Sequence, residues 1–251
     1  MILAYHRPNT FAEALKLISR SNPKTLPLGG GTLLSRPTKE AFEVVDLQSL
    51  KLDKIQKKGN NLEIGATTTL QKLLENSLTP SAIRTALKLE APLNLRNSGT
   101  VAGTLVSSDG RSTLTTVLLA LDAKITLQPE DQEIQLGELL ATREESLRGK
   151  LITSITIPLN VNITFESLAR TPADKPIVCA ALAIWSSKRA RLALGGYGKA
   201  PLLAMDGTET EGLEIAARNA VHEATDDFAS AEYRVAVAEI LSTRCLRTNE
   251  K

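Results

Sequence analysis

The sequence predicts an α+β protein of two domains, and three observations support this expectation. The chain has 251 residues, of which 42% are hydrophobic, enough for two cores of modest size. Apolar residues follow helical spacing in some segments and strand spacing in others. At Leu159–Asn162 the pattern changes to strand-like segments followed by two amphipathic helices, which is typical of a small α+β domain. We expect one domain over residues 1–158 and another over residues 159–251.

The first expected helix begins after Thr10. Thr10 and Glu13 have the spacing of a capping box, in which a hydroxyl and a carboxylate accept hydrogen bonds from free N–H groups of the first turn. One face of the helix is apolar, with Phe11, Ala14, Leu15 and Ile18. After a break at "NPK", the segments "TLPL" and "EVVDL" predict two short strands.

A hairpin and several helices are expected in the middle of the chain. "DKIQKKGNNLEIGA" predicts a hairpin that turns at Gly59–Asn61, because Gly and Asn tolerate the positive φ of tight turns. Helices are expected over Thr68–Asn76 and from Thr79, with Pro80 at the first helical position. A loop rich in Gly, Ser and Thr is expected over Asn97–Ser112. A buried helix, "LTTVLLALDA", should follow it.

The remaining segments predict strands and two closing helices. "KITLQ", "EIQL" and "LITSITIP" predict strands before the boundary. After it, "TFESLAR", "VCAALAIW" and "RARLALGGYG" predict an antiparallel sheet. Amphipathic helices are expected near Glu211–Ala224 and Ser230–Arg247.

The composition argues against several classes of partner. The 30 basic and 28 acidic residues give a net charge of +2 with no long charged block, so neither nucleic acid nor insertion into a membrane is expected. No apolar run approaches the roughly 18 residues of a membrane span, and no signal-peptide pattern is present, so a cytoplasmic protein is expected. Cys179 and Cys245 form no CxxC, so we expect two buried thiols and no metal centre on this chain.

The segment "PLGGGTLLSRP", Pro27–Pro37, contains three consecutive glycines followed by Thr32. It matches neither the P-loop nor the dinucleotide fingerprint. Two interpretations remain for this loop alone. Adjacent N–H groups without side chains form a concave nest that binds an anion, with the Thr32 hydroxyl as a further donor. Alternatively, the glycines serve a tight turn or a close crossing of two chain segments, which is the more frequent case.

A second segment of small residues, "RNSGTVAGTLVSSDG", strengthens the anion-binding interpretation. Gly99, Ala102 and Gly103 surround Thr100, and Thr104 follows. N–H groups and hydroxyls from two such loops suit two phosphate groups of one ligand, with little cationic help. A pyrophosphate cofactor is therefore a chemically reasonable hypothesis, which the two loops alone do not establish.

Four stretches occur in the order and spacing of a known family. They are "PLGGGTLLSRP", "IGATTTLQKLL", "RNSGTVAGTLVSSDG" and "LITSITIP". In this combination the chain resembles, over nearly its full length, the FAD-binding medium subunits of molybdenum hydroxylases of the carbon monoxide and xanthine dehydrogenase family. The resemblance implies a two-part FAD-binding domain of the vanillyl-alcohol-oxidase-like type, with parts at about 1–53 and 54–158. A small domain with an antiparallel sheet and helices should follow.

The resemblance also implies a set of FAD-binding residues. The two glycine loops would grip the FAD pyrophosphate, so that its phosphates lie close to Gly29–Gly31, and further residues would complete the site. The implied set is Leu28, Gly29, Gly30, Gly31, Thr32, Leu33, Leu34, Thr100, Val101, Ala102, Gly103, Thr104, Ser108, Asp109, Thr113 and Ile155. No catalytic residue and no metal ligand is expected.

The chain departs from the family pattern at several of these positions. Leu33 stands where Asp or Ser is usual, Ala102 replaces a Gly, and Thr104 replaces an Asn. Thr113 stands where an acidic residue is common. These changes bear on the affinity for FAD more than on the fold. Asp109 would substitute as a carboxylate or simply face solvent.

The function implied is that of a flavoprotein subunit. Electrons from a molybdopterin-binding large subunit would pass through a 2Fe-2S small subunit to FAD and then to an acceptor, in a complex such as a dimer of heterotrimers. The alternative is a flavin-free subunit that kept the fold as an assembly scaffold. A stand-alone flavin oxidase is a weaker third interpretation, because no substrate-binding constellation is evident.

Two further expectations concern the loops. FAD should bind non-covalently, because neither loop contains a His or Cys to form a flavin linkage. A valine at Gly30 should weaken FAD binding and leave the fold intact, because the loop is not expected to be core. Arg111, in the second loop, should either approach a phosphate or face solvent.

Overall fold

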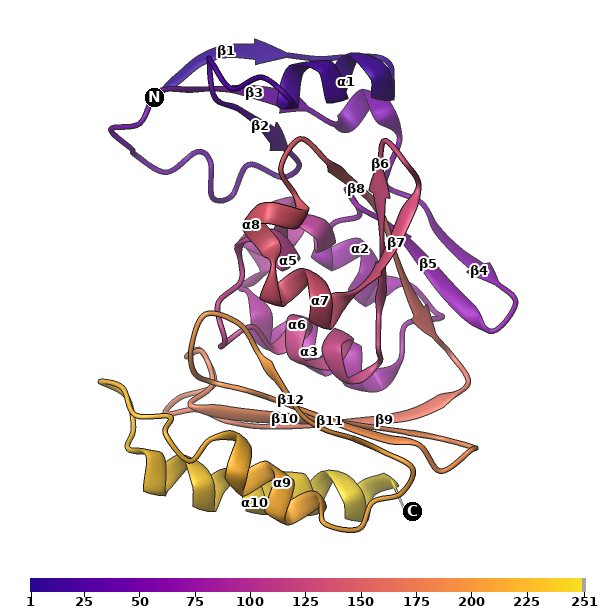
Figure 1. The fold of residues 1–251 in the computed structure, drawn as a ribbon, viewed down its shortest axis with the longest axis vertical. Helices are drawn as coiled ribbons and strands as arrows, with labels where there is room; N and C mark the ends of the chain where they lie inside the picture. The colour runs from indigo at the N-terminus through magenta and orange to yellow at the C-terminus, as the bar shows by residue number, and fades with distance from the viewer. Residues whose placement is uncertain (250–251) are drawn as a thin grey trace.

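The computed structural model describes residues 1–249 (Figure 1). Within this part of the chain the strands form three sheets, arranged one after another along the long axis of the molecule (Figure 1). The first sheet is parallel and the other two are antiparallel. Helices lie between and beside the sheets, so the α+β class predicted from the sequence agrees with the structure.

The first sheet has the strand order β1-β3-β2, formed by Ile2–His6, Phe42–Asp46 and Thr25–Leu28. Helix α1, Phe11–Ile18, packs on it. The Thr10 cap is present, since the Glu13 N–H donates to the Thr10 hydroxyl. The Glu13 carboxylate accepts from the Asn9 N–H, one residue before the cap, rather than from the Thr10 N–H of a capping box. A short 3₁₀ turn, Gln48–Leu50, leads out of the sheet.

The second sheet has five strands in the order β4-β5-β8-β6-β7. The predicted hairpin is β4, Ile55–Lys58, and β5, Asn61–Gly65. The other three strands are β8, Leu151–Pro158, β6, Lys124–Gln128, and β7, Gln132–Gln135.

Seven helices accompany this sheet within the described residues. They are α2 (Leu70–Glu75), α3 (Ser81–Glu90), α4 (Leu93–Ser98), α5 (Val101–Ser107), α6 (Thr113–Ala120), α7 (Leu136–Ala141) and α8 (Arg143–Ser146). Helix α6 is buried along its whole length, as the run of apolar residues predicts. The largest hydrophobic core of the molecule is formed between these helices and the sheet.

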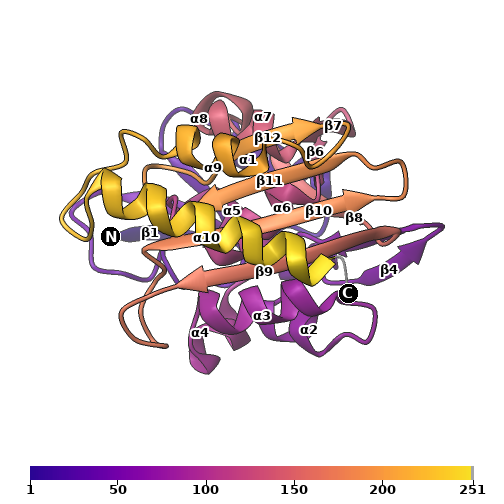
Figure 2. The same ribbon diagram turned by 90° about the horizontal axis from the view of Figure 1, so that it is seen from below.

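The third sheet has the order β12-β11-β10-β9, formed by Leu202–Gly207, Ala190–Gly195, Val178–Trp185 and Val161–Leu168. Helices α9, Leu213–Ala220, and α10, Ala231–Asn249, cover its outer face (Figures 1 and 2).

The inner face of the third sheet packs on α3 and α6. Side chains along β10 alternate between the two faces: Ala181 and Ala183 join the core around α6, whereas Ala180 and Leu182 join the core beneath α9 and α10. The small alanine side chains let α6 lie close to the sheet. The boundary at residue 159 falls between β8 and β9 and remains a prediction.

The prediction of a loop over Asn97–Ser112 is wrong, because most of this segment is helical. Helix α4 extends to Ser98, and α5 begins at Val101. Thr100 provides the N-cap of α5, its hydroxyl accepting from the Gly103 N–H. The small residues that suggested a loop therefore sit within a capped helix. Strands β1 and β12 and helices α7 and α8 were also not expected from the sequence.

Both cysteine thiols are buried, on opposite faces of the third sheet. The Cys179 Sγ lies 3.6 Å from the Thr116 hydroxyl of α6, and the Cys245 Sγ, on α10, lies 3.6 Å from the Ala180 carbonyl oxygen. Burial raises the pKa of each thiol to about 12.

We predict that neither thiol reacts with 5,5′-dithiobis(2-nitrobenzoate) at mildly alkaline pH in the native protein, because both remain protonated and inaccessible. Both should react in denaturant. The colour released before and after unfolding measures this. Rapid reaction of either thiol in the folded chain would contradict the burial described here.

Among residues 1–249, no helix is long and apolar enough to span a bilayer.

Candidate functional site

The first glycine loop follows directly from β2. Gly31 has φ of +69°, a left-handed conformation that favours glycine, and the Ser35 N–H donates to the Gly31 carbonyl oxygen. The N–H groups of Gly30, Gly31 and Thr32 donate no hydrogen bond to any acceptor within residues 1–249. Adjacent half-buried donors without partners are what an anion-binding nest requires. This loop therefore offers free donors to a ligand.

The second loop has fewer free donors than the sequence suggests. The Val101 N–H donates to the Thr68 carbonyl oxygen at 2.9 Å, and the Ala102 N–H donates to the Ala66 carbonyl oxygen at 3.2 Å. The Gly103 N–H donates to the Thr100 hydroxyl. Since the chain itself uses these three groups, the second loop faces a ligand mainly with hydroxyls.

The two loops touch each other, and this contact explains two of the glycines. A Cβ on Gly30 would lie 1.7 Å from the Ser98 carbonyl oxygen, and one on Gly29 would lie 2.8 Å from the Thr100 hydroxyl oxygen. A close crossing of two chain segments therefore requires glycine at both positions. The expectation that a valine at Gly30 spares the fold is wrong, because its Cβ would clash with backbone rather than occupy open space.

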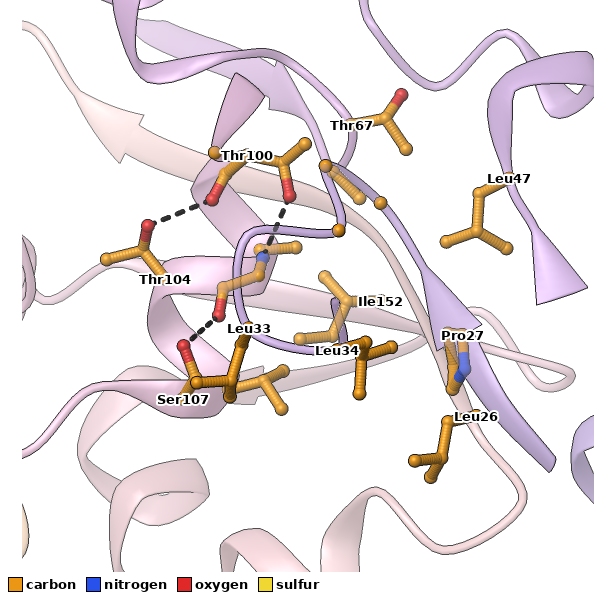
Figure 3. Close-up of a pocket in the computed structure, with 18 of the residues that line it drawn as sticks. Leu26, Pro27, Leu33, Leu34, Leu47, Thr67, Thr100, Thr104, Ser107 and Ile152 are labelled. Atoms are coloured by element: carbon orange, nitrogen blue, oxygen red, sulfur yellow. Dashed lines mark hydrogen bonds between the residues drawn. The ribbon is translucent and has the colours of Figure 1, made fainter. Parts of the chain in front are cut away.

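A cavity of about 370 Å³ opens where the loops meet, between the first sheet and the second (Figure 3). Hydroxyl groups of Thr100, Thr104 and Ser107 gather on one side of it (Figure 3). The apolar side chains of Leu26 and Leu47 lie on the other side (Figure 3). The cavity thus combines polar donors with apolar surface, as cofactor sites commonly do.

The cavity brings together ten of the predicted residues. They are Gly29, Gly30, Gly31, Thr32, Leu33, Leu34, Thr100, Ala102, Gly103 and Thr104. Two of these ten residues, Leu33 and Thr104, depart from the family pattern, and the structure shows the surroundings of both. Leu33 is 47% exposed at the cavity, and the Thr104 hydroxyl donates to the Thr100 carbonyl oxygen. The assignment of these ten residues to cofactor binding remains a prediction.

The other six predicted residues do not line the cavity. Val101 and Ile155 are fully buried in the main core, and Thr113 is buried with its hydroxyl donating to the Ala86 carbonyl oxygen. Leu28 is the last residue of β2 and lies beside Gly31.

The last two of these six, Ser108 and Asp109, follow α5. The Ser108 carbonyl oxygen accepts from Arg143 of α8 at 2.7 Å, and the Asp109 carboxylate forms an ion pair with Lys175. The role predicted for all six rests on the resemblance alone.

Arg111 neither approaches the cavity nor faces solvent. Its guanidinium lies 3.2 Å from the Asp226 carboxylate and 3.5 Å from the centre of the Phe228 ring. The residue therefore joins the segment after α5 to the segment before α10.

Sequence reasoning missed several residues of the cavity. The α8–β8 connection and the start of β8 contribute Leu147, Lys150, Leu151 and Ile152. Lys150 alone among the described lining residues carries a formal charge. These residues lie 37 or more positions after the second loop segment, which ends at Gly110, and no local motif marks them, so only the sheet topology brings them to the site.

The residues present fit an FAD pyrophosphate. The nest of free N–H groups, the hydroxyls of the second loop and one cation suit a phosphate-bearing group, and the leucine-lined side suits a ring system. When bound there, FAD would supply the redox chemistry, and the chain would hold and orient it.

The fold is similar to that of solved molybdenum enzymes. A chain of the Cu,Mo-CO dehydrogenase crystal structure matches with a TM-score of 0.81 and 24% identity, covering 98% of both chains. A chain of quinoline 2-oxidoreductase from Pseudomonas putida 86 matches with a TM-score of 0.79 and 19% identity, covering 100% of this chain and 98% of the other. The chain therefore has the fold of a component of such oxidoreductases.

Sequence comparison defines the family. The model described as the FAD binding domain in molybdopterin dehydrogenase matches residues 1–160. The chain belongs to this family of FAD-binding components of molybdopterin-dependent dehydrogenases, which confirms the resemblance and the class of enzyme expected from the sequence.

Three relatives match over 81–96% of this chain, and two of them are named as medium chains of dehydrogenases. The carbon monoxide dehydrogenase medium chain of Afipia carboxidovorans is 26% identical, over 96% of this chain and 94% of its own. The glyceraldehyde dehydrogenase medium chain of Sulfolobus acidocaldarius is 27% identical, over 81% and 78%. The YgfM protein of Escherichia coli is 29% identical, over 96% and 94%.

Proposed function

We propose that the chain binds one FAD non-covalently in the cavity between its two glycine loops and serves as the electron-transfer subunit of a molybdenum-containing oxidoreductase. The observation that carries this proposal is the cavity at which both loops meet, with three N–H groups of the first loop left free for an anion. Membership of an FAD-binding family supports the pyrophosphate of FAD as this anion.

The arrangement around the cavity supports a division of tasks. The Gly30, Gly31 and Thr32 N–H groups would hold the pyrophosphate. The Thr100 hydroxyl, which accepts from the Gly103 N–H and donates to no acceptor among the described residues, would add a hydrogen bond, and the Thr104 hydroxyl would add another only by leaving the Thr100 carbonyl oxygen. We further infer that residues 1–158 form the two-part FAD-binding domain of the vanillyl-alcohol-oxidase-like type.

The partners are inferred from the relatives, two of which are named as medium chains of dehydrogenases. We infer that a molybdopterin-binding large subunit and an iron–sulfur small subunit deliver electrons to the flavin, in a dimer of heterotrimers in the cytoplasm. A final acceptor then removes the electrons from this chain.

Denaturation should release the flavin intact. The described residues that line the cavity include neither His nor Cys, the side chains that form covalent flavin linkages. After acid precipitation of the FAD-loaded protein, flavin absorbance is therefore expected in the supernatant. Flavin that remained with the precipitated chain would refute non-covalent binding.

Purification from the native source tests the subunit assignment. At native expression level, the chain should copurify with two other subunits, and iron and molybdenum should be present in the complex. A lone flavoprotein with full activity on a small substrate would refute the assignment. A complex that contains this chain without FAD would instead favour the scaffold interpretation.

A further inference from the structure

The residues that line the cavity include one lysine, which neither glycine motif predicts. Lys150 lies directly before β8 and lines the cavity together with both glycine loops. We propose that Lys150 is a binding residue of the site, and that its ammonium group contacts the pyrophosphate of FAD and provides the positive charge that the loops lack. This inference rests on the proposed function.

The partners of Lys150 leave its charge largely uncompensated. Its Nζ donates to the neutral Gln132 side-chain oxygen at 2.7 Å, and the nearest carboxylate oxygen, from Glu130, lies 3.8 Å away. Glu130 is 72% exposed, so solvent screens this pair strongly. The Lys150 side chain is only 30% exposed, and it can turn towards an anion in the cavity by rotation about its flexible stem.

The charge of the ligand favours a cation at this position. Pyrophosphate is the only group of FAD that is anionic at neutral pH, and bringing it into a partly apolar cavity costs free energy unless a positive charge compensates. The other polar groups of the described lining are neutral hydroxyls and backbone N–H groups. Lys150 is the one ionised donor of the described lining, and its charge adds a Coulomb attraction to phosphate that neutral hydroxyl and N–H donors lack, so its removal should lower the affinity measurably.

Titration of purified full-length variants with FAD tests the proposal, with flavin fluorescence as the readout. Lys150→Gln keeps most of the side-chain stem and removes the charge, and should weaken FAD binding about tenfold. Lys150→Arg keeps the charge and should bind FAD within about threefold of the parent. Lys124→Gln is the matched control, because Lys124 is the first residue of β6, which pairs with β8, and it forms an ion pair with Glu133 and does not line the cavity. It should bind FAD like the parent.

The outcomes separate this inference from the proposed function. If the parent binds FAD and Lys150→Gln binds it equally well, Lys150 does not contact the pyrophosphate. An equal loss in Lys150→Arg and Lys150→Gln, or a loss in Lys124→Gln, would also overturn the proposal, because neither pattern reports a specific charge in the cavity. If the parent itself does not bind FAD, the proposed function fails, and this inference fails with it.

Discussion

Replacing Gly30 by valine should abolish FAD binding and lower the stability of the whole chain. The new Cβ would lie 1.7 Å from the Ser98 carbonyl oxygen, which belongs to the backbone and cannot turn away. The two glycine loops must therefore separate, which removes the cavity that they form. We expect a loss of at least about 3 kcal/mol of unfolding free energy. Chemical denaturation and FAD titration of the variant measure the two effects.

Gly137→Ala is the control for this experiment. Gly137 lies within α7, and a Cβ there would meet only the Leu119 side chain, at an ordinary contact distance of 3.5 Å. Alanine favours helix more than glycine does, so stability should stay equal or rise by up to about 1 kcal/mol. FAD affinity should not change. A Gly30→Val protein with the stability of its parent would show that the loops do not cross as described.

Replacing Arg234 by methionine should produce the second large effect, on stability rather than on cofactor binding. The Arg234 side chain is 1% exposed and donates to the carbonyl oxygens of Ile177, Ala224 and Ala229. It also donates to the Asp226 carboxylate at 2.7 Å. Methionine would leave the Ile177 and Ala224 carbonyl oxygens without this donor, whereas Asp226 would keep Arg111 as a partner. We therefore expect a loss of about 3 kcal/mol of unfolding free energy, the low end for breaking a buried ionic network.

Urea unfolding of Arg234→Met measures this cost. Arg218→Met is the control, since Arg218 is 56% exposed and its nearest carboxylate oxygen, from Glu239, lies 3.7 Å away. That surface pair should contribute no more than about 1 kcal/mol. Equal stabilities of the two variants would refute a structural role for the Arg234 network.

The same network makes stability depend on acid pH. Desolvation alone would raise the pKa of Asp226, but hydrogen bonds from Arg234 and from the Phe228 and Ala229 N–H groups outweigh it and lower the pKa to about 2. Because the folded pKa is below the unfolded one, this stabilisation is present above about pH 4 and is lost as the pH falls towards 2. Asp226→Asn should lose less stability than the parent over that interval, in urea titrations at stepped pH.

Much of the fold follows from local signals in the sequence. Thr10 and Glu13 mark the start of α1, and Gly59 with its positive φ marks the first hairpin. Helix α5 was not predicted because it contains Gly103 and the hydroxyl residues Thr104 and Ser107, residue types that favour turns. Its cap becomes evident only when the Thr100 hydroxyl is seen to accept from Gly103. Tertiary contacts to Ala66 and Thr68 then stabilise its first turn.

The candidate site was predictable in outline, and a close crossing of two chain segments was one of two interpretations of the glycines, but the crossing segment was not predictable. Both glycine loops were identified, and both line the same cavity. Positions 29 and 30 require glycine because they contact the second loop. The sequence of the first loop alone does not show which segment it contacts. Lys150 reaches the cavity through the pairing of β8 with β5 and β6, a long-range arrangement that no local spacing encodes.

Titration of the purified full-length chain with FAD tests the central claim most directly. We predict that binding saturates at one FAD per chain and that the flavin absorption spectrum shifts on binding. The folded chain should keep its FAD on a desalting column, and the denatured chain should lose it. A chain that remains folded by circular dichroism yet leaves the FAD spectrum and fluorescence unchanged at saturating concentrations would contradict the account.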